Sequence, residues 1–82
     1  MEAVAGIQQF LEFVLGGLTE RPSAARVTQR EQNGSTIFDL AVDGGDMPRL
    51  IGTGGGTVNA LRSLVQGAAD REGLRVGVTI SE

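Results

Sequence analysis

The sequence predicts an α+β domain with the element order α-β-β-α-α-β, in which three helices pack on one face of a mixed three-stranded sheet. Three observations lead to this prediction. Apolar residues recur at helical spacing in three stretches, near residues 2–15, 46–51 and 58–68. They alternate with polar residues in two others, 35–42 and 76–80. The dipeptide Asn33-Gly34, a strong hairpin signal, precedes the first of these alternating stretches.

The first helix is expected from about Glu2 to Leu15, ended by Gly16 and Gly17. Its apolar stripe consists of Val4, Ile7, Leu11 and Val14, followed by Leu15 and Leu18. Two aromatic residues, Phe10 and Phe13, broaden the apolar surface beyond one stripe. In so small a domain we expect both in the core or at its rim, and the alternative is a patch that faces a partner.

A β-hairpin is expected next. The segment from Ala25 to Gln32 has Val27 as its only large apolar residue, which is typical of an edge strand. The second strand, 35–42, places Phe38, Leu40 and Val42 on one face. A third strand carries Val76, Val78 and Ile80, and a two-helix crossover favours a parallel pairing with the second strand.

A pair of helices fills that crossover. Asp46 is expected to cap a short helix that contains Met47 and Pro48 in its first turn and ends at Gly52. Four glycines allow a sharp turn by positive φ and close backbone approach, and they are Gly52, Gly54, Gly55 and Gly56. The longer helix that follows has a stripe of Val58, Leu61, Val65 and Ala68, widened by Leu64, and Gly73 is placed to end it.

Glycine loops that open onto a helix usually hold phosphate, because free N–H groups and the helix dipole favour an anion there. A dinucleotide-binding fingerprint does not fit, because the segment before the loop contains Pro48 and reads as helix, and Thr57 stands at the final glycine or alanine position. A Walker loop requires a lysine, and the chain has none.

The segment Ile51-Gly52-Thr53-Gly54-Gly55 between two helices resembles the Gly-x-x-Gly loop of a KH domain. The resemblance extends over nearly the whole chain, because a helix and hairpin precede the loop and a strand follows, which is the bacterial type II order. The length, the Asp46-Met47 entry and Ala60-Leu61-Arg62 resemble the small single-KH proteins of the KhpA type. We therefore expect one KH domain over residues 1–82.

The resemblance implies that the loop clamps about four nucleotides of single-stranded RNA, with the bases in a groove beside the sheet. The residues this implies for RNA contact are Arg49, Ile51, Gly52, Thr53, Gly54, Gly55, Gly56, Thr57 and Arg62. An apolar groove floor would come from Leu50, Ile51, Val58 and Leu61, although a place in the core is the favoured alternative for each of them. Relatives often carry Lys in place of Thr53 and Arg in place of Gly56, so micromolar or weaker affinity is expected.

The resemblance also implies an RNA chaperone or post-transcriptional regulator that forms a homodimer and pairs with a larger Jag-type (KhpB) RNA-binding protein. The dimer contact is expected on the longer helix near the loop. Gly67, with Ala68 and Ala69, permits close helix packing in the core or across such a dimer. The rival hypothesis is a degenerate KH module that binds protein and little RNA, with the glycine run as a mere connector.

The amino-acid composition argues against several classes of function. The chain lacks Cys, His, Tyr and Trp, so most general bases and the commonest metal ligands are missing, and we expect neither an enzyme nor a cofactor. The net charge is −3, which argues against tight nonspecific nucleic-acid binding. Residues 1–43 hold three arginines against six acidic residues, and residues 44–82 hold four against four. A cytoplasmic protein is expected, because the apolar first eighteen residues begin with Glu2 in place of a basic segment and are interrupted by Gln8, Gln9 and Glu12, unlike a signal peptide. No stretch is long enough to span a membrane.

Overall fold

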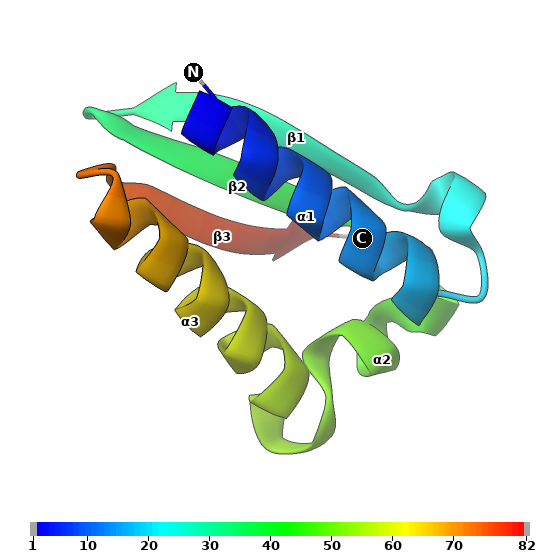
Figure 1. The fold of residues 1–82 in the computed structure, drawn as a ribbon. Coiled ribbons are helices and arrows are strands. Elements are labelled where there is room, and N and C mark those ends of the chain that lie inside the picture. Colours follow the sequence, from blue (N-terminus) through cyan, green and yellow to red (C-terminus); the bar gives the residue numbers. More distant parts are fainter. Residues whose placement is uncertain (1, 82) are drawn as a thin grey trace.

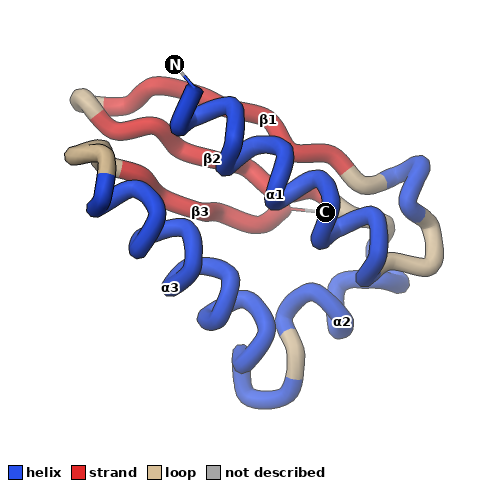
Figure 2. Tube along the Cα trace, in the orientation of Figure 1, coloured by secondary structure: helices blue, strands red, loops and turns tan. Residues whose placement is uncertain are grey.

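A computed structural model describes residues 2–81, which form three helices and three strands joined by short turns. The elements are α1 (Glu2–Leu18), β1 (Arg26–Gln32), β2 (Ser35–Ala41), α2 (Met47–Ile51), α3 (Gly56–Arg71) and β3 (Val76–Ser81). The sheet order is β1-β2-β3, with β1 antiparallel and β3 parallel to the central strand. Helices α1 and α3 lie side by side over one face, and α2 adjoins one end of the pair (Figures 1 and 2). The predicted fold class and strand directions are confirmed.

The core lies between the sheet and the helices. Helix α1 contributes Ile7, Leu11 and Leu15, and the central strand contributes Phe38 and Leu40. The remaining buried members of the cluster are Val27, Val42, Leu50, Leu61, Val65, Ala69 and Val78. Since α1, α2, α3 and all three strands supply side chains to one cluster, the position of α2 is fixed by the same packing that holds the sheet.

Two turns form as their sequences predict. Asn33 and Gly34 have φ values of 52° and 82°, the paired positive values of a tight hairpin turn. At the end of α3, Gly73 has φ of 68°. The Gly73 N–H donates to the Asp70 carbonyl at 3.3 Å, and the Leu74 N–H donates to the Ala69 carbonyl at 2.9 Å. These two bonds make a glycine-ended C-terminus that directs the chain into β3.

The expected end of the first helix is wrong. Helix α1 continues through Gly16 and Gly17 to Leu18. Both the backbone N–H and the hydroxyl of Thr19 donate to the Leu15 carbonyl, at 3.1 and 2.8 Å, and so close the last turn. Leu15 is buried and Leu18 packs against the core, so the extra turn is held by apolar contacts that outweigh the low helix propensity of glycine.

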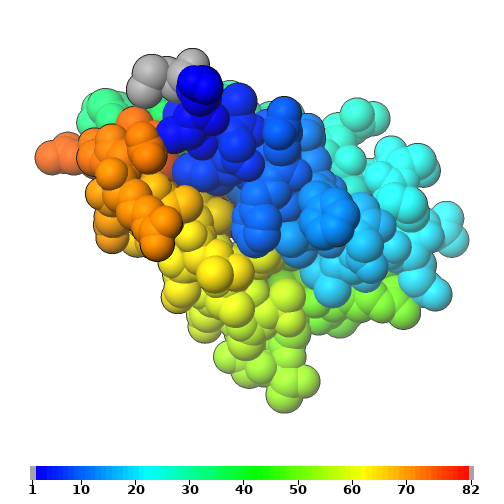
Figure 3. All heavy atoms as spheres, in the orientation of Figure 1, coloured from blue at the N-terminus to red at the C-terminus, as the bar shows by residue number. Residues whose placement is uncertain are grey.

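The outward faces of α1 and α3 also differ from expectation. On α3, Ala69 is buried in place of Ala68, and the Leu64 side chain is 59% exposed. On α1, Phe10 is 38% and Phe13 is 81% exposed, so Phe13 lies outside the core and its rim. Both helices belong to the same outer surface of the molecule (Figure 3). The alternative of a partner-facing patch therefore fits Phe13 better.

None of the helices within residues 2–81 combines the length and the apolar character that crossing a membrane requires.

The helical conformation of Gly16 allows a direct test of the C-terminal turn of α1. Gly16→Ala should raise the free energy of unfolding by about 0.5–1 kcal/mol, because alanine favours helix and an added Cβ at Gly16 meets no atom within 4 Å. Urea denaturation measures the change. Gly34→Ala is the control, and it should be destabilising because of its positive φ. A loss of stability in Gly16→Ala would mean that α1 ends before this residue.

Candidate nucleic-acid interface

The glycine loop connects α2 to α3 through one short 3₁₀ turn, Thr53–Gly55. Gly52 directly follows α2, and its N–H donates to the Pro48 carbonyl at 2.9 Å. Gly52 has a φ of 77°. Gly54 and Gly55 follow with φ of 62° and 81°. Gly56 has an ordinary helical φ of −59° and begins α3, so the expectation of positive φ holds for three of the four glycines.

Gly52 is the position at which the chain approaches itself most closely. A Cβ added there would lie 2.7 Å from the backbone nitrogen of Thr57, a separation that real side chains essentially never show. An added Cβ at Gly54 meets no atom within 4 Å. The first glycine is thus required by the turn itself, whereas Thr53 and Gly54 are exposed at its tip and available to a ligand.

Helix α3 presents an uncapped N-terminus to this loop. Gly55 occupies the N-cap position, and no side chain bonds to the first turn. The opening N–H groups of an α-helix have no partner within the helix, although that of Gly56 here donates to the Thr53 carbonyl. The dipole of the 16-residue helix adds partial positive charge at this end. Thr57, half-buried in this turn, carries a hydroxyl beside those groups. The arrangement suits an anion.

Asp46 does not cap α2 as the sequence suggested. Its side chain is 2% exposed and accepts no hydrogen bond from the backbone N–H groups of the helix that follows. One carboxylate oxygen, Oδ1, accepts the Glu20 N–H at 3.0 Å, and the other, Oδ2, accepts the Arg21 N–H at 3.0 Å. Asp43 instead caps the short 3₁₀ turn Gly44–Asp46 that precedes α2, accepting the Gly45 N–H at 3.0 Å. Asp46 therefore ties the start of α2 to the chain that leaves α1.

Arg49 lies between two acidic groups. Its Nη1 is 3.0 Å from Asp46 Oδ1 and 2.8 Å from Glu20 Oε1. The Glu20 N–H, followed by the Arg21 N–H and the Arg49 guanidinium, lowers the pKa of the Asp46 carboxyl against the opposing effect of its burial. The guanidinium charge is thus already neutralised within the protein, which weakens Arg49 as the phosphate contact expected from the sequence.

Arg62 keeps its charge available. Its Nε donates to the Val78 carbonyl at 3.3 Å, which directs the side chain from α3 toward β3. It forms no ion pair with any other residue between 2 and 81. Of the two arginines expected at the site, Arg62 is therefore the one with an unneutralised charge.

Most of the expected apolar floor belongs to the core. Leu50, Val58 and Leu61 are buried, whereas Ile51 is 39% exposed next to the loop.

Two further residues lie near the site and were not foreseen from the sequence. Glu20 is brought beside Arg49 only by the fold, and no local pattern indicates it. Asn59 also lies near the loop, because its side-chain nitrogen is 3.3 Å from the position that a Cβ on Gly55 would take. Its place in the first turn after the glycines is the sequence feature that could have identified it as a site residue.

Comparison with known proteins gives consistent matches. The family model described as KhpA/KhpB, KH domain, matches residues 8–80. A relative from Chlamydia pneumoniae is 30% identical over 93% of this chain and 97% of its own length. Relatives from Leifsonia xyli subsp. xyli and Halalkalibacterium halodurans are 34% and 32% identical, covering 83% and 90% of this chain and 90% and 97% of their own lengths. All three are named RNA-binding protein KhpA. No solved structure gave a significant match.

The element order and the glycine loop between the last two helices define a KH domain of the type II order. The chain belongs to the KhpA/KhpB KH-domain family and is a small protein of the KhpA type. This family is not one of enzymes, in agreement with the expectation from composition.

The bonds to Asp46 predict an acid-dependent stability. A carboxyl whose pKa is lowered by folding stabilises the protein above its unfolded pKa of about 3.9, and this contribution is lost as pH falls through the lower folded value. Asp46→Asn should therefore melt several degrees lower at neutral pH and lose less further stability below about pH 4. Circular dichroism melts across this range measure both effects.

Asp43→Asn is the matched control, because that side chain is partly exposed and accepts a single N–H. Asp39 should preserve some acid sensitivity in every variant, since the Thr79 hydroxyl and Arg30 also lower its pKa. Equal melting temperatures for Asp46→Asn and the wild type at neutral pH would show that the buried carboxylate does not hold α2 in place.

Proposed function

We propose that this protein binds single-stranded RNA through the loop from Gly52 to Gly56, acting over residues 1–82 as a single KH domain. The observation that carries the proposal is the uncapped N-terminus of α3 behind an exposed glycine turn. The printed names of the relatives, RNA-binding protein KhpA, support the same ligand. The N–H groups of Gly52, Gly55 and Gly56 already donate to backbone carbonyls, so those of Thr53 and Gly54 at the loop tip would face phosphate oxygens. The clamp therefore needs no charged side chain in the loop itself.

Side chains around the loop would supplement the backbone. The hydroxyls of Thr53 and Thr57 are suitable donors to phosphate, and Ile51 offers an apolar surface next to the loop. Arg62 would supply the main fixed positive charge. Each phosphate contact contributes a salt slope of about −0.7 for a single strand, so few contacts mean a shallow slope and micromolar or weaker affinity.

In the cell, such a domain would serve as an RNA chaperone or post-transcriptional regulator in the cytoplasm. We extend the proposal to a homodimer and to association with a larger Jag-type (KhpB) RNA-binding protein, on the ground of family membership. The expected dimer contact on α3 near the loop has little support from the packing, since the exposed surface there is made of small or polar residues such as Asn59 and Ala60.

A second candidate function is a protein-interaction module with little RNA affinity. The neutralised Arg49 and the exposed Phe13 and Leu64 favour it. The two candidates differ in where a substitution acts, because RNA binding depends on the loop and protein binding on the outer helix faces.

Negative charge at the loop tip tests the clamp. The double variant Thr53→Asp, Gly54→Asp should lose at least about tenfold in affinity for an RNA of about eight nucleotides, because two carboxylates would stand where a phosphate binds. Aspartate tolerates the positive φ of Gly54 better than most residues, so the fold should survive. Fluorescence anisotropy at two salt concentrations measures the effect.

The matched control for this pair is Ser23→Asp, Ala24→Asp, which adds the same charge in an exposed turn away from the loop. It should bind nearly as well as the wild type. Equal losses in both double variants would indicate a response to net charge alone, and no binding by the folded wild type would favour the protein-interaction module.

Removing one acidic neighbour of Arg49 should strengthen the binding of RNA. In Glu20→Gln the guanidinium keeps only one acidic neighbour, so affinity should rise roughly two- to fivefold and the salt slope should steepen by up to about 0.7. Glu12→Gln, which removes the same charge from a side chain of α1 that bonds to Gln8 and not to Arg49, controls for net charge. Identical gains in the two variants would rule out a specific role for Arg49.

A further inference from the structure

One face of the sheet is left uncovered within residues 2–81, because α1, α2 and α3 all lie against the other face (Figures 1 and 2). Alternate residues of a strand point to opposite faces. Val27, Phe38 and Val78 are buried toward the helices, so their direct neighbours in each strand point outward. The outward residues that matter most are Arg26, Arg30, Ile37, Asp39, Thr79 and, directly before β3, Arg75. We call this surface the open face.

Positive charge is concentrated on the open face. It holds three of the seven arginines and, of the nine acidic residues between 2 and 81, only Asp39. Arg26 and Arg75 are exposed and form no ion pair with any residue from 2 to 81. A protein with a net charge of −3 thus presents one surface of the opposite sign.

The one acidic residue of the open face is already engaged. Asp39 Oδ2 accepts the Arg30 Nε–H at 3.0 Å, and Asp39 Oδ1 accepts the Thr79 hydroxyl. Arg30 Nη1 also donates to the Gln32 side chain, so two bonds hold the guanidinium on the face. A phosphate that approaches the open face would therefore not meet a bare carboxylate. It would meet a network that spans all three strands.

The polarity of the open face suits a nucleic-acid strand better than a membrane or an apolar partner. The large apolar side chains that are exposed between residues 2 and 81 belong to α1, α2 and α3, and none belongs to the sheet. At the centre of the face Ile37 is half-buried and its Cδ1 lies 2.9 Å from the position that a Cβ on Gly77 would take. Ile37 thus lies over Gly77, and a low apolar centre is flanked by the arginines.

Arg62 connects the open face with the proposed clamp. Strand β3 pairs only with β2, and the Arg75 carbonyl accepts the Thr36 N–H, so alternate carbonyls of β3 point toward β2 and the others toward the free edge of the sheet. The Val78 carbonyl belongs to the second set, and Arg62 Nε donates to it at 3.3 Å. The Arg62 guanidinium therefore lies at the edge over which a strand held by the loop would reach the open face.

We propose that the open face is a second contact surface for single-stranded RNA, reached by a strand that passes from the glycine loop over Arg62 at the edge of β3. The inference rests on the proposed RNA clamp. Arg26 and Arg75 would contact phosphates, and the fixed guanidinium of Arg30 would stack under an unpaired base. Since phosphate contacts carry no sequence information, the open face would hold a strand without selecting its bases.

The spacing of the arginines sets the length of RNA that profits. In the paired register Arg26 lies beside Ala41 and Ser81, six residues along β3 from Arg75. Six residues and two strand spacings correspond to about 22 Å between Arg26 and Arg75. A strand of about five nucleotides would be used up by the clamp, whereas one of about twenty would also cross the open face. Two further phosphate contacts would steepen the salt slope by about 1.4.

Titration with RNAs of about five and about twenty nucleotides tests the inference. The double variant Arg26→Gln, Arg75→Gln should bind the short RNA as the wild type does. For the long RNA it should lose about tenfold in affinity, with a salt slope shallower by about 1.4. Fluorescence anisotropy at two salt concentrations measures both quantities. Comparison of the two proteins on the same RNA removes the statistical advantage of a longer strand.

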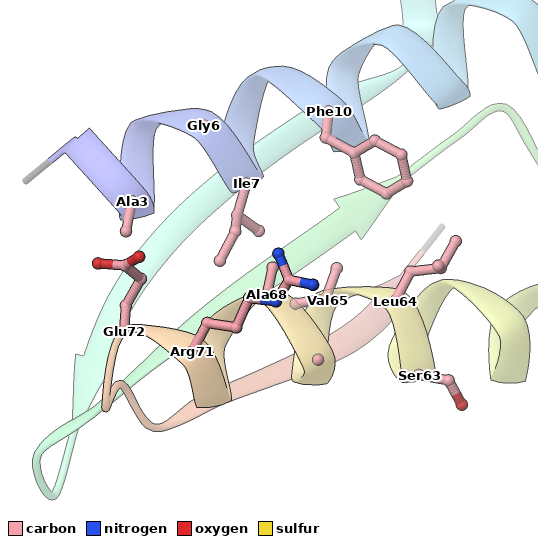
Figure 4. A pocket seen from close by; sticks show the side chains of 11 residues that line it. Ala3, Gly6, Ile7, Phe10, Ser63, Leu64, Val65, Ala68, Arg71 and Glu72 are labelled. Carbon is pink, nitrogen blue, oxygen red and sulfur yellow. The ribbon is translucent and has the colours of Figure 1, made fainter.

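An arginine on the opposite side of the molecule supplies part of the control. A mostly apolar groove of about 660 Å³ runs between α1 and α3, starting at Ser63, and Arg71 extends over it (Figure 4). Gly67 also lines this groove, and a Cβ added there would meet no atom within 4 Å. The expectation that Gly67 permits close packing in the core is therefore wrong. Arg71 lies on the helix side, away from the open face.

The matched control is Arg21→Gln, Arg71→Gln, which removes the same charge from two arginines outside the strands. It should bind both RNAs within about twofold of the wild type. All four substituted side chains are exposed, so both double variants should melt within about 3 °C of the wild type. Equal losses in the two double variants would reduce the effect to net charge and overturn the inference.

The remaining outcomes separate the open face from the clamp. Wild-type affinity of Arg26→Gln, Arg75→Gln for the long RNA would refute the open face and leave the clamp intact. If the wild type binds only the long RNA and this variant binds neither, the clamp fails and the open face stands. A wild type that binds neither RNA would refute both. Flotation with phosphatidylglycerol vesicles that needs Arg26 and Arg75, beside unchanged RNA binding, would assign the face to a membrane and overturn the inference.

Discussion

The buried carboxylate of Asp46 is the contact on which the placement of the candidate site depends. Helix α2 has only five residues and cannot be stable by itself, so it must be held by tertiary contacts. Leu50 anchors it in the core, and Asp46 fixes its beginning to the backbone that leaves α1. The direction of α2 in turn decides where Gly52 turns and where α3 begins.

The same carboxylate determines the electrostatics of the site. Together with Glu20 it engages Arg49, one of the few cations close to the loop. What remains for an anionic strand is backbone N–H groups, hydroxyls and the charge of Arg62. A site of this kind recognises phosphate by geometry more than by charge, because helix N–H groups are fixed in direction while their partial charge is small. Weak, readily reversed binding is therefore what we expect of the proposed clamp.

Helix α3 links the two surfaces of the molecule. Its N-terminus forms the candidate anion site, its buried stripe packs on the sheet, and its outer side forms one wall of the groove. Loop and groove lie at different places along this helix, so a ligand at one would not compete for the residues of the other.

The sequence by itself determined the element order, the strand directions, the hairpin turn at Asn33-Gly34 and the position of the glycine loop. These follow from local rules, because alternation, helical spacing and positive φ are properties of neighbouring residues. Only the tertiary structure decided that α1 runs through Gly16 and Gly17, that Phe13 and Leu64 face outward, and that Asp46 binds Glu20 and Arg21 in place of capping α2. Each of these depends on residues far apart in the chain, and the free energy of such contacts exceeds the local preference that the sequence displays.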